Sequence, residues 1–155
     1  MNAALSPLVI NRSIPFDPSI RFGKGWRIQE QDMRSVRLAQ IDLRNTTLET
    51  TLRPGERSIT GEERMYRLKS EKGNGIRLDA GIIASLERDT NMFPDLWKKY
   101  LHHNVIQIFF DGTILLSPDG RRASLFVSMF HGRFGSGYRW LEFERRSIHP
   151  SVVYV

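Results

Sequence analysis

The sequence predicts an α+β domain in which a helical middle segment is followed by an antiparallel sheet of β-hairpins. Two changes of pattern support this fold class. Residues 60–101 carry apolar side chains at helical spacing, and after His103 apolar residues alternate with a period of two, which is typical of strands. The length of 155 residues and the hydrophobic content of 40% suit one domain with one core.

The first 25 residues are expected to form an irregular arm. Pro7, Pro15 and Pro18, together with Gly23 and Gly25, interrupt both helical and strand periods. We therefore treat residues 1–25 as an arm and assign residues 26–155 to a single α+β domain.

Short strands are expected to follow this arm. Trp26 begins the first, and the Thr-rich residues 48–52 form another. The apolar pattern over residues 36–43 fits a strand best, while a short helix stays open as an alternative. Residues 53–56, Arg-Pro-Gly-Glu, have the central Pro and Gly of a turn.

Three helices are expected in the middle of the chain. Thr60 and Glu63 have the spacing of a capping box, so a helix should begin at Thr60 and end before Gly73. A second should start at Asp79 and run through Leu86. A third should start at Pro94, whose ring suits the first helical position, and continue through residue 101.

Hairpins are expected after His103. Asp111-Gly112 is the strongest hairpin signal, because a type I′ turn needs positive φ at both central residues. Residues 117–120 predict a second turn, and a third lies between His131-Gly132 and residues 135–137. The strands are expected at residues 105–110, 113–116, 123–130, 138–143 and 152–155, the last closing the sheet edge.

Composition excludes several classes of protein. Because the chain has no Cys, it has neither a disulfide framework nor a thiolate site. No apolar run approaches the ~20 residues of a membrane-spanning helix. Residues 1–11 lack the basic start and long apolar core of a signal peptide. We therefore expect a cytoplasmic protein without a membrane span.

No motif for catalysis or for cofactor binding rises above a structural explanation. Asp111 and Asp119 are conceivable as an acid–base pair, yet both precede Gly in predicted turns, where Asp is expected for backbone reasons. The histidines have no metal-ligand spacing; they are His102, His103, His131 and His149. We expect no metal, no cofactor and no enzymatic activity.

Arginine and aromatic residues are concentrated near the C-terminus. The stretch from Arg121 to His149 contains six arginines and two glutamates, so +4 of the formal net charge of +6 lies there. Six aromatics between Phe126 and Phe143 interleave with Arg, Ser and Gly. This is the composition of a binding surface, and Arg with aromatics also stacks on unpaired bases. A sheet core would account for the aromatics equally well.

Motifs along most of the chain resemble those of an uncharacterised family of predicted proteins from candidate-phyla bacteria. They lie at residues 14–18 (Ile-Pro-Phe-Asp-Pro), 23–26, 30–32, 61–63, 76–80, 109–113 (Phe-Phe-Asp-Gly-Thr), 138–141 (Tyr-Arg-Trp-Leu) and 150–151. Relatives differ most over the stretch that corresponds to residues 130–149. That stretch looks like the variable region of retroelement-diversified proteins, which display variable side chains on a C-type-lectin-like fold.

The resemblance implies a C-type-lectin-like fold, binding without catalysis, and a set of contact residues. Trp140, Leu141 and Pro150 would belong to the scaffold. The contact residues would be Phe130, His131, Arg133, Phe134, Ser136, Tyr138, Arg139, Glu142, Phe143, Arg145 and Arg146. This chain departs from the pattern in having Phe, Arg and Glu where relatives often have Trp and Asn.

Two functions follow from these observations. The first is a non-enzymatic binding protein that displays an Arg/aromatic surface to an unknown protein or ligand target. The alternative is a basic nucleic-acid-binding module that uses the same arginines and aromatics.

Overall fold

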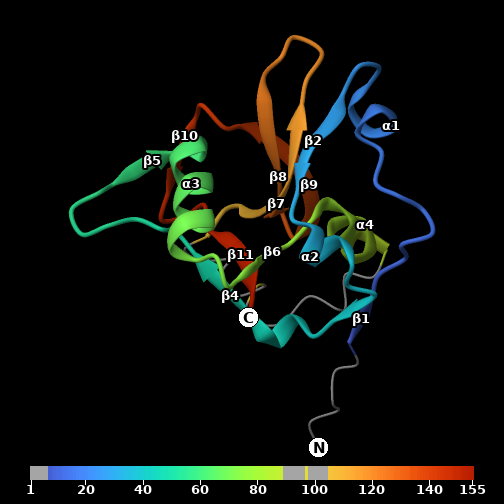
Figure 1. The fold of residues 1–155 in the computed structure, drawn as a ribbon, viewed down its shortest axis with the longest axis horizontal. Coiled ribbons are helices and arrows are strands. Elements are labelled where there is room, and N and C mark those ends of the chain that lie inside the picture. Colours follow the sequence, from blue (N-terminus) through green and yellow to red (C-terminus); the bar gives the residue numbers. More distant parts are fainter. Residues whose placement is uncertain (1–6, 89–96, 98–104) are drawn as a thin grey trace, which may run out of the picture.

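The protein has a mixed α+β fold, which confirms the predicted fold class (Figure 1). The computed structural model describes residues 7–88, 97 and 105–155. Helix α3 (Gly61–Glu71) lies at one side of the main sheet beside a two-stranded ribbon of β5 (Ser58–Thr60) and β10 (Glu144–Arg146), and helix α4 (Ala80–Arg88) lies at the other side.

Seven strands form the main sheet, in the order β4-β11-β7-β8-β9, with β2 pairing β7 and β6 pairing β11. All pairs are antiparallel except β11 with β7, which run parallel. The strands are β2 (Arg27–Gln31), β4 (Thr46–Glu49), β6 (Ile76–Arg77), β7 (Ile108–Leu116), β8 (Arg122–Phe130), β9 (Arg133–Trp140) and β11 (Ser151–Tyr154). The last strand lies between β4 and β7, so the prediction that it closes the sheet edge is wrong.

The prediction of a turn at Asp111-Gly112 is also wrong, because both residues lie inside the single long strand β7. The register with β8 shifts between Phe110 and Ile114, which marks a bulge. A Cβ on Gly112 would lie 2.2 Å from the carbonyl oxygen of Arg77, so glycine is needed here for close approach of two backbones. The Gly112 N–H donates to the Leu78 carbonyl at 2.9 Å.

The other two turns lie near their predicted places. The Gly120 N–H donates to the Ser117 carbonyl at 3.0 Å, which confirms the turn between β7 and β8. His131 and Gly132 connect β8 to β9 with φ of 48° and 73°. Positive φ at both residues is the requirement of a type I′ turn. Residues 135–137 lie within β9 and not in a turn.

Two helices of the middle segment are confirmed. The Thr60 side chain accepts a hydrogen bond from the Glu63 N–H at 3.1 Å and caps α3. Helix α4 begins one residue after Asp79 and buries Ile82, Ile83 and Leu86. The helix predicted over residues 94–101 falls outside the described residues, apart from the buried Trp97.

Residues 7–25 include a strand and a helix and pack onto the domain, so the prediction of an irregular arm is wrong for these residues. Strand β1 (Leu8–Val9) pairs with β3 (Gln40–Ile41), and Leu8 and Ile10 are buried in the main core. Helix α1 (Pro18–Phe22) is capped by Asp17. Arg12 forms an ion pair of 2.7 Å with Asp79 at the start of α4. Proline and glycine pointed to breaks in regular structure here, but not to the burial between them.

Residues 33–45 contain both of the elements that their pattern allowed. Helix α2 (Met33–Val36) precedes β3, and a 3₁₀ helix (Leu43–Asn45) leads into β4. Asp32 caps α2 by accepting from the Arg34 N–H.

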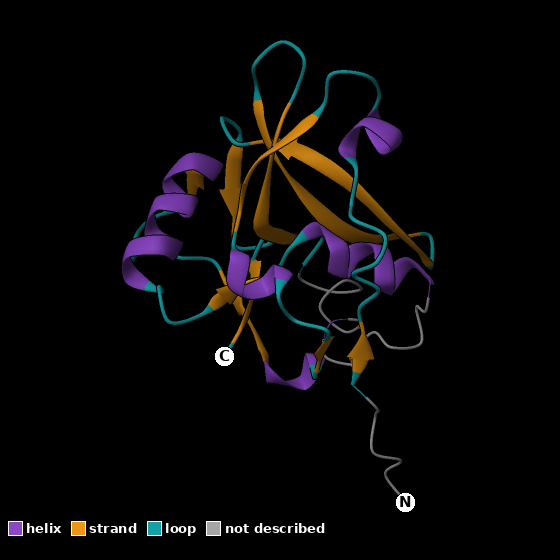
Figure 2. Cartoon of the chain, turned by 45° about the vertical axis from the view of Figure 1, so that its right-hand side comes forward, coloured by secondary structure: helices purple, strands orange, loops and turns teal. Residues whose placement is uncertain are grey.

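The main core lies between α4 and one face of the sheet. Figure 2 shows α4 beneath the long strands and α1 beside them. Ala123, Leu125 and Val127 of β8 face this core, as their alternation predicted, with Met129 packed at its border. None of the helices in the described part of the chain has the length and apolar content that a membrane span requires.

Candidate functional site

One group of partly exposed aromatic side chains brings together three distant parts of the chain. Phe22 ends α1, Trp26 directly precedes β2, and Tyr138 and Trp140 lie on β9. Tyr138 pairs with Leu125 and Trp140 with Ala123, so both rings extend the core face of the sheet outward. With Arg121 and Phe143, these residues form what we call the aromatic–arginine surface.

The rings of this surface form a continuous stack. Trp26 lies 4.8 Å from Tyr138 and 5.8 Å from Trp140, measured between ring centres, and the two indoles are nearly parallel at 13°. Phe22 contacts both Trp26, at 5.3 Å, and Tyr138, at 5.1 Å. Tyr138 and Trp140 meet edge to face at 5.0 Å. These separations are those of favourable aromatic pairs.

Arg121 covers the outer end of the stack. Its guanidinium carbon lies 3.9 Å from the Trp140 ring centre and 5.7 Å from that of Phe143. Glu142 holds the guanidinium in place by accepting from Arg121 Nε at 2.7 Å. Tyr138 is 36% exposed and Phe143 is 48% exposed, so part of the stack is open to solvent. A cation over an indole is the strongest form of cation–π contact.

Positive charge borders this surface. Lys24 and Arg27 flank Trp26 in the sequence, and both are exposed. Among the described residues, neither has a carboxylate within ion-pair distance. Gly25, between them, packs against Pro118 of the β7–β8 turn, which places this basic segment beside Arg121.

The predicted contact residues do not form one surface. Tyr138, Glu142 and Phe143 belong to the aromatic–arginine surface or pair with it. His131 and Arg133 are exposed at the β8–β9 turn. The backbone of Phe130 is described as the end of β8, and its side chain lies outside what the structure describes.

Two predicted residues of the hairpin do not point freely into solvent. Phe134 is partly buried against the main core. The Ser136 hydroxyl donates to Glu87 of α4 at 2.5 Å. Arg146 is exposed on β10, at 3.7 Å from Glu144.

The prediction that Arg145 is a contact residue is wrong. Arg145 is 1% exposed and therefore cannot be part of a displayed surface. Its Nη1 donates to the carbonyls of Trp140 and Phe143, both at 3.1 Å, so it holds the turn between β9 and β10. Its Nη2 donates to the carbonyl of Arg139 at 3.3 Å. Burial, together with the nearby charge of Arg64, lowers the pKa of Arg145 to about 9. Arg139 is partly buried, and its Nε is enclosed.

Sequence reasoning missed Phe22 and Trp26 and assigned Trp140 to the scaffold. The available signal was the presence of two large aromatics within or next to a segment rich in Pro and Gly. Their partners on β9 are more than a hundred positions away, so the pairing was not visible from local pattern.

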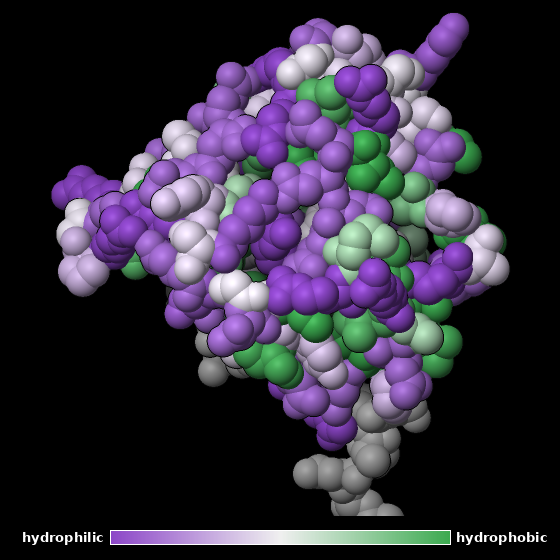
Figure 3. Space-filling view, viewed as in Figure 1, coloured by the Kyte–Doolittle hydropathy of each residue, from purple (hydrophilic) through white to green (hydrophobic). Residues whose placement is uncertain are grey.

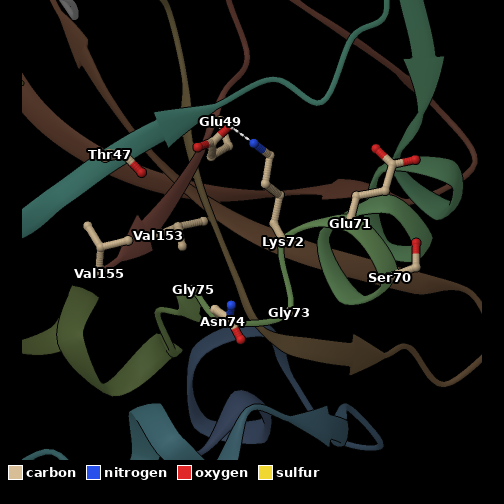
Figure 4. Close-up of a pocket in the computed structure, with 10 residues that line it drawn as sticks. All are labelled: Thr47, Glu49, Ser70, Glu71, Lys72, Gly73, Asn74, Gly75, Val153 and Val155. Carbon is tan, nitrogen blue, oxygen red and sulfur yellow. Dashed lines mark ion pairs between the residues drawn. The ribbon is translucent and has the colours of Figure 1, made fainter.

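Two hollows lie away from these residues. One, of about 480 Å³, is bordered by β4, the end of α3 and the C-terminus, and Figure 4 shows the 3.8 Å ion pair of Glu49 with Lys72 within it. The other, of about 210 Å³, is bordered by Ile14, Phe16 and the Arg12–Asp79 pair. Neither contains a predicted contact residue.

The described residues contain no group of three or more His, Asp or Glu placed to hold a metal ion.

Comparison of this chain with protein-family models, with curated proteins and with solved structures found no match.

Proposed function

We propose that this protein is a non-enzymatic binding protein that contacts its partner through the aromatic–arginine surface. The observation that carries the proposal is the connected, partly exposed stack from Phe22 to Arg121. Tyr, Trp and Arg are the side chains that contribute most of the free energy at protein interfaces. The face shown in Figure 3 is mostly hydrophilic, with apolar side chains in separate places.

The arrangement favours contact over chemistry. Arg121 is already held by Glu142 and by the Trp140 ring, and the rings are held by one another and by the core beneath them. A partner would therefore meet side chains that lose little freedom on binding, which lowers the entropic cost of association. The absence of cysteine supports a cytoplasmic setting for this activity.

We also propose a role as a diversified display protein with a C-type-lectin-like fold. In this role, only the exposed residues among the predicted contact residues would vary. His131, Arg133, Glu142, Phe143 and Arg146 are exposed and would tolerate many side chains. Arg145 would not, because its substitution removes hydrogen bonds to three carbonyls and empties a buried side-chain position.

A random peptide library displayed on phage tests the binding function. Peptides selected on the native protein should lose at least about tenfold in affinity for Tyr138→Ala, because truncation of a central aromatic anchor costs more than ~1.4 kcal/mol. Tyr66→Ala, which truncates an exposed tyrosine of α3 outside this surface, is the matched control and should bind as the native protein does. Failure to enrich any peptide, or equal binding to both variants, would contradict the proposal.

Single-stranded nucleic acid is the second candidate partner. The specific observation is the position of Lys24 and Arg27, exposed and without carboxylate partners among the described residues, on both sides of Trp26. Bases stack on aromatic rings while cations neutralise phosphates. Oligothymidylate and oligouridylate should then quench the fluorescence of Trp26 and Trp140, with affinity falling steeply as salt rises. Quenching that is absent, or that salt does not weaken, removes this candidate.

A further inference from the structure

A second group of residues, most of them polar, lies in the interior around Phe109. We call it the Phe109 cluster: Arg64, Phe109, Asp111, Arg145, His149 and Ser151. Each of these residues is 1% exposed or less. They come from α3, β7, β10, β11 and the loop before β11, so the cluster joins α3 and the β5–β10 ribbon to the sheet (Figure 1).

Phe109 lies at the centre of the cluster. The guanidinium carbons of Arg64 and Arg145 are 4.9 Å and 4.3 Å from its ring centre, and the His149 ring centre is 6.3 Å away. Ser151 is the strand partner of Phe109 in the parallel register of β11 with β7. The four polar side chains therefore border one aromatic ring.

The cluster carries more positive than negative charge. Arg64 Nε lies 3.3 Å from Asp111 Oδ2. Arg145 donates to backbone carbonyls and to Ser124 Oγ at 3.5 Å, and in the described part of the chain no carboxylate lies within ion-pair distance of it. Arg139 Nε is enclosed beside the same residues. A buried cation without a counter-charge is costly, so this excess needs an explanation.

Several buried atoms of the cluster also have no hydrogen-bond partner, and most of them are donors. They are Arg64 Nη2, Arg145 Nε, His149 Nε2 and Ser151 Oγ, with Asp111 Oδ2 as the one acceptor. The Arg146 N–H donates to His149 Nδ1 at 3.1 Å, so in the neutral imidazole Nε2 bears the proton and is a donor too. Burial, with the charges of Arg139, Arg146, Arg145 and Arg64, lowers the pKa of His149 to about 4, which keeps the ring neutral at physiological pH.

We propose that the Phe109 cluster is an internal binding site for one small inorganic oxyanion, such as phosphate or sulfate. The anion is bound by Arg145, His149 and Ser151, while Arg64 stays paired with Asp111. Its oxygens accept from Arg145 Nε, His149 Nε2 and Ser151 Oγ, and its charge offsets the uncompensated arginine. A buried water would accept the same hydrogen bonds and leave the charge as it is.

Equilibrium dialysis against radiolabelled phosphate tests the proposal. The native protein is unfolded in urea and refolded in phosphate, because a site with no exposed side chain is best loaded while the chain folds. We expect about one phosphate per chain, retained after dialysis in competition with chloride, and a melting temperature that rises with phosphate and saturates.

Ser151→Ala is the diagnostic variant, because its hydroxyl has no partner to lose and the variant should fold as stably as the native protein. Phosphate affinity should fall at least about tenfold, as expected for the loss of one hydrogen bond to a charged group. Ser128→Ala, on β8 and outside the cluster, is the control and should keep native affinity. Three outcomes overturn the proposal: no retained phosphate, unchanged affinity in Ser151→Ala, or a melting temperature that rises without saturation and equally in all variants, which is the general effect of excluded salts.

Discussion

Substituting Gly112 by Ala should destabilise the fold far more than a buried Gly→Ala change in a strand ordinarily would. The added Cβ would lie 2.2 Å from the Arg77 carbonyl oxygen and 2.5 Å and 2.6 Å from the carbonyl carbon and oxygen of Leu78. Contacts of ordinary length begin near 3.4 Å, so the two backbone segments must separate by about 1 Å. That movement strains two hydrogen bonds: the one that the Gly112 N–H donates to the Leu78 carbonyl, and the one that the Asp32 N–H donates to the Gly112 carbonyl.

Overpacking of this kind costs about 1–3 kcal/mol, and the loss of a buried backbone hydrogen bond adds roughly 1 kcal/mol. For a chain of this length, about 3 kcal/mol corresponds to a melting temperature roughly 6–12 °C lower. Urea unfolding followed by circular dichroism measures the change. Gly135→Ala on β9 is the matched control, because a Cβ there meets nothing within 4 Å, and it should be neutral or stabilising by about 0.5–1 kcal/mol. Equal effects of the two substitutions would refute the close approach at Gly112 and return Asp111-Gly112 to a surface turn.

Further predictions concern acid stability, helix capping and the buried arginine. Because the pKa of His149 is lowered to about 4 from a usual 6.5, mainly by burial, the unfolded chain binds this proton more tightly. Stability should therefore fall as pH drops from 6.5 toward 4, by a limit of about 3 kcal/mol at about 1.36 kcal/mol per pKa unit. In urea titrations at several pH values, His149→Asn should flatten this slope and His131→Asn should not. Thr60→Ala should cost about 1 kcal/mol in the same assay, since it removes the cap of α3, and a loss below the error of the measurement would contradict the cap. Arg145→Ala should cost about 3 kcal/mol or prevent folding, because it removes hydrogen bonds to three carbonyls and empties a buried side-chain position; native-like stability would show that the β9–β10 turn does not depend on it.

Local signals in the sequence were sufficient where neighbouring residues decide the structure. Thr60 and Glu63 fixed the start of α3, and the alternation from Ala123 to Val127 identified the core face of β8. The turn at residues 117–120 depends on its own Pro, Asp and Gly, and it was predicted correctly.

Local signals failed where distant residues decide the structure. Asp111-Gly112 has the composition of a type I′ turn, but the contact of Gly112 with Arg77 and Leu78 keeps it in a bulged strand, and only tertiary packing reveals that contact. The type I′ conformation is adopted at His131-Gly132 instead.

The candidate site was predicted in part for the same reason. Tyr138 and Phe143 were named because aromatic and arginine residues cluster near them. Phe22 and Trp26 join them only through the pairing of β2 with β7. Arg145 looked like a surface cation, since charge is normally exposed, and its burial beside Phe109 depends on α3 covering that face of the sheet.

Saturation mutagenesis of residues 22–27 and 121–146, with folded expression and binding of a selected peptide read separately, tests the central claim most directly. The structure predicts that substitutions at Arg121, Tyr138 and Trp140 reduce binding more than expression, while substitutions at Leu141 and Arg145 reduce expression. If binding losses concentrate at His131 and Arg133 instead, or follow expression at every position, the aromatic–arginine surface is not the binding site.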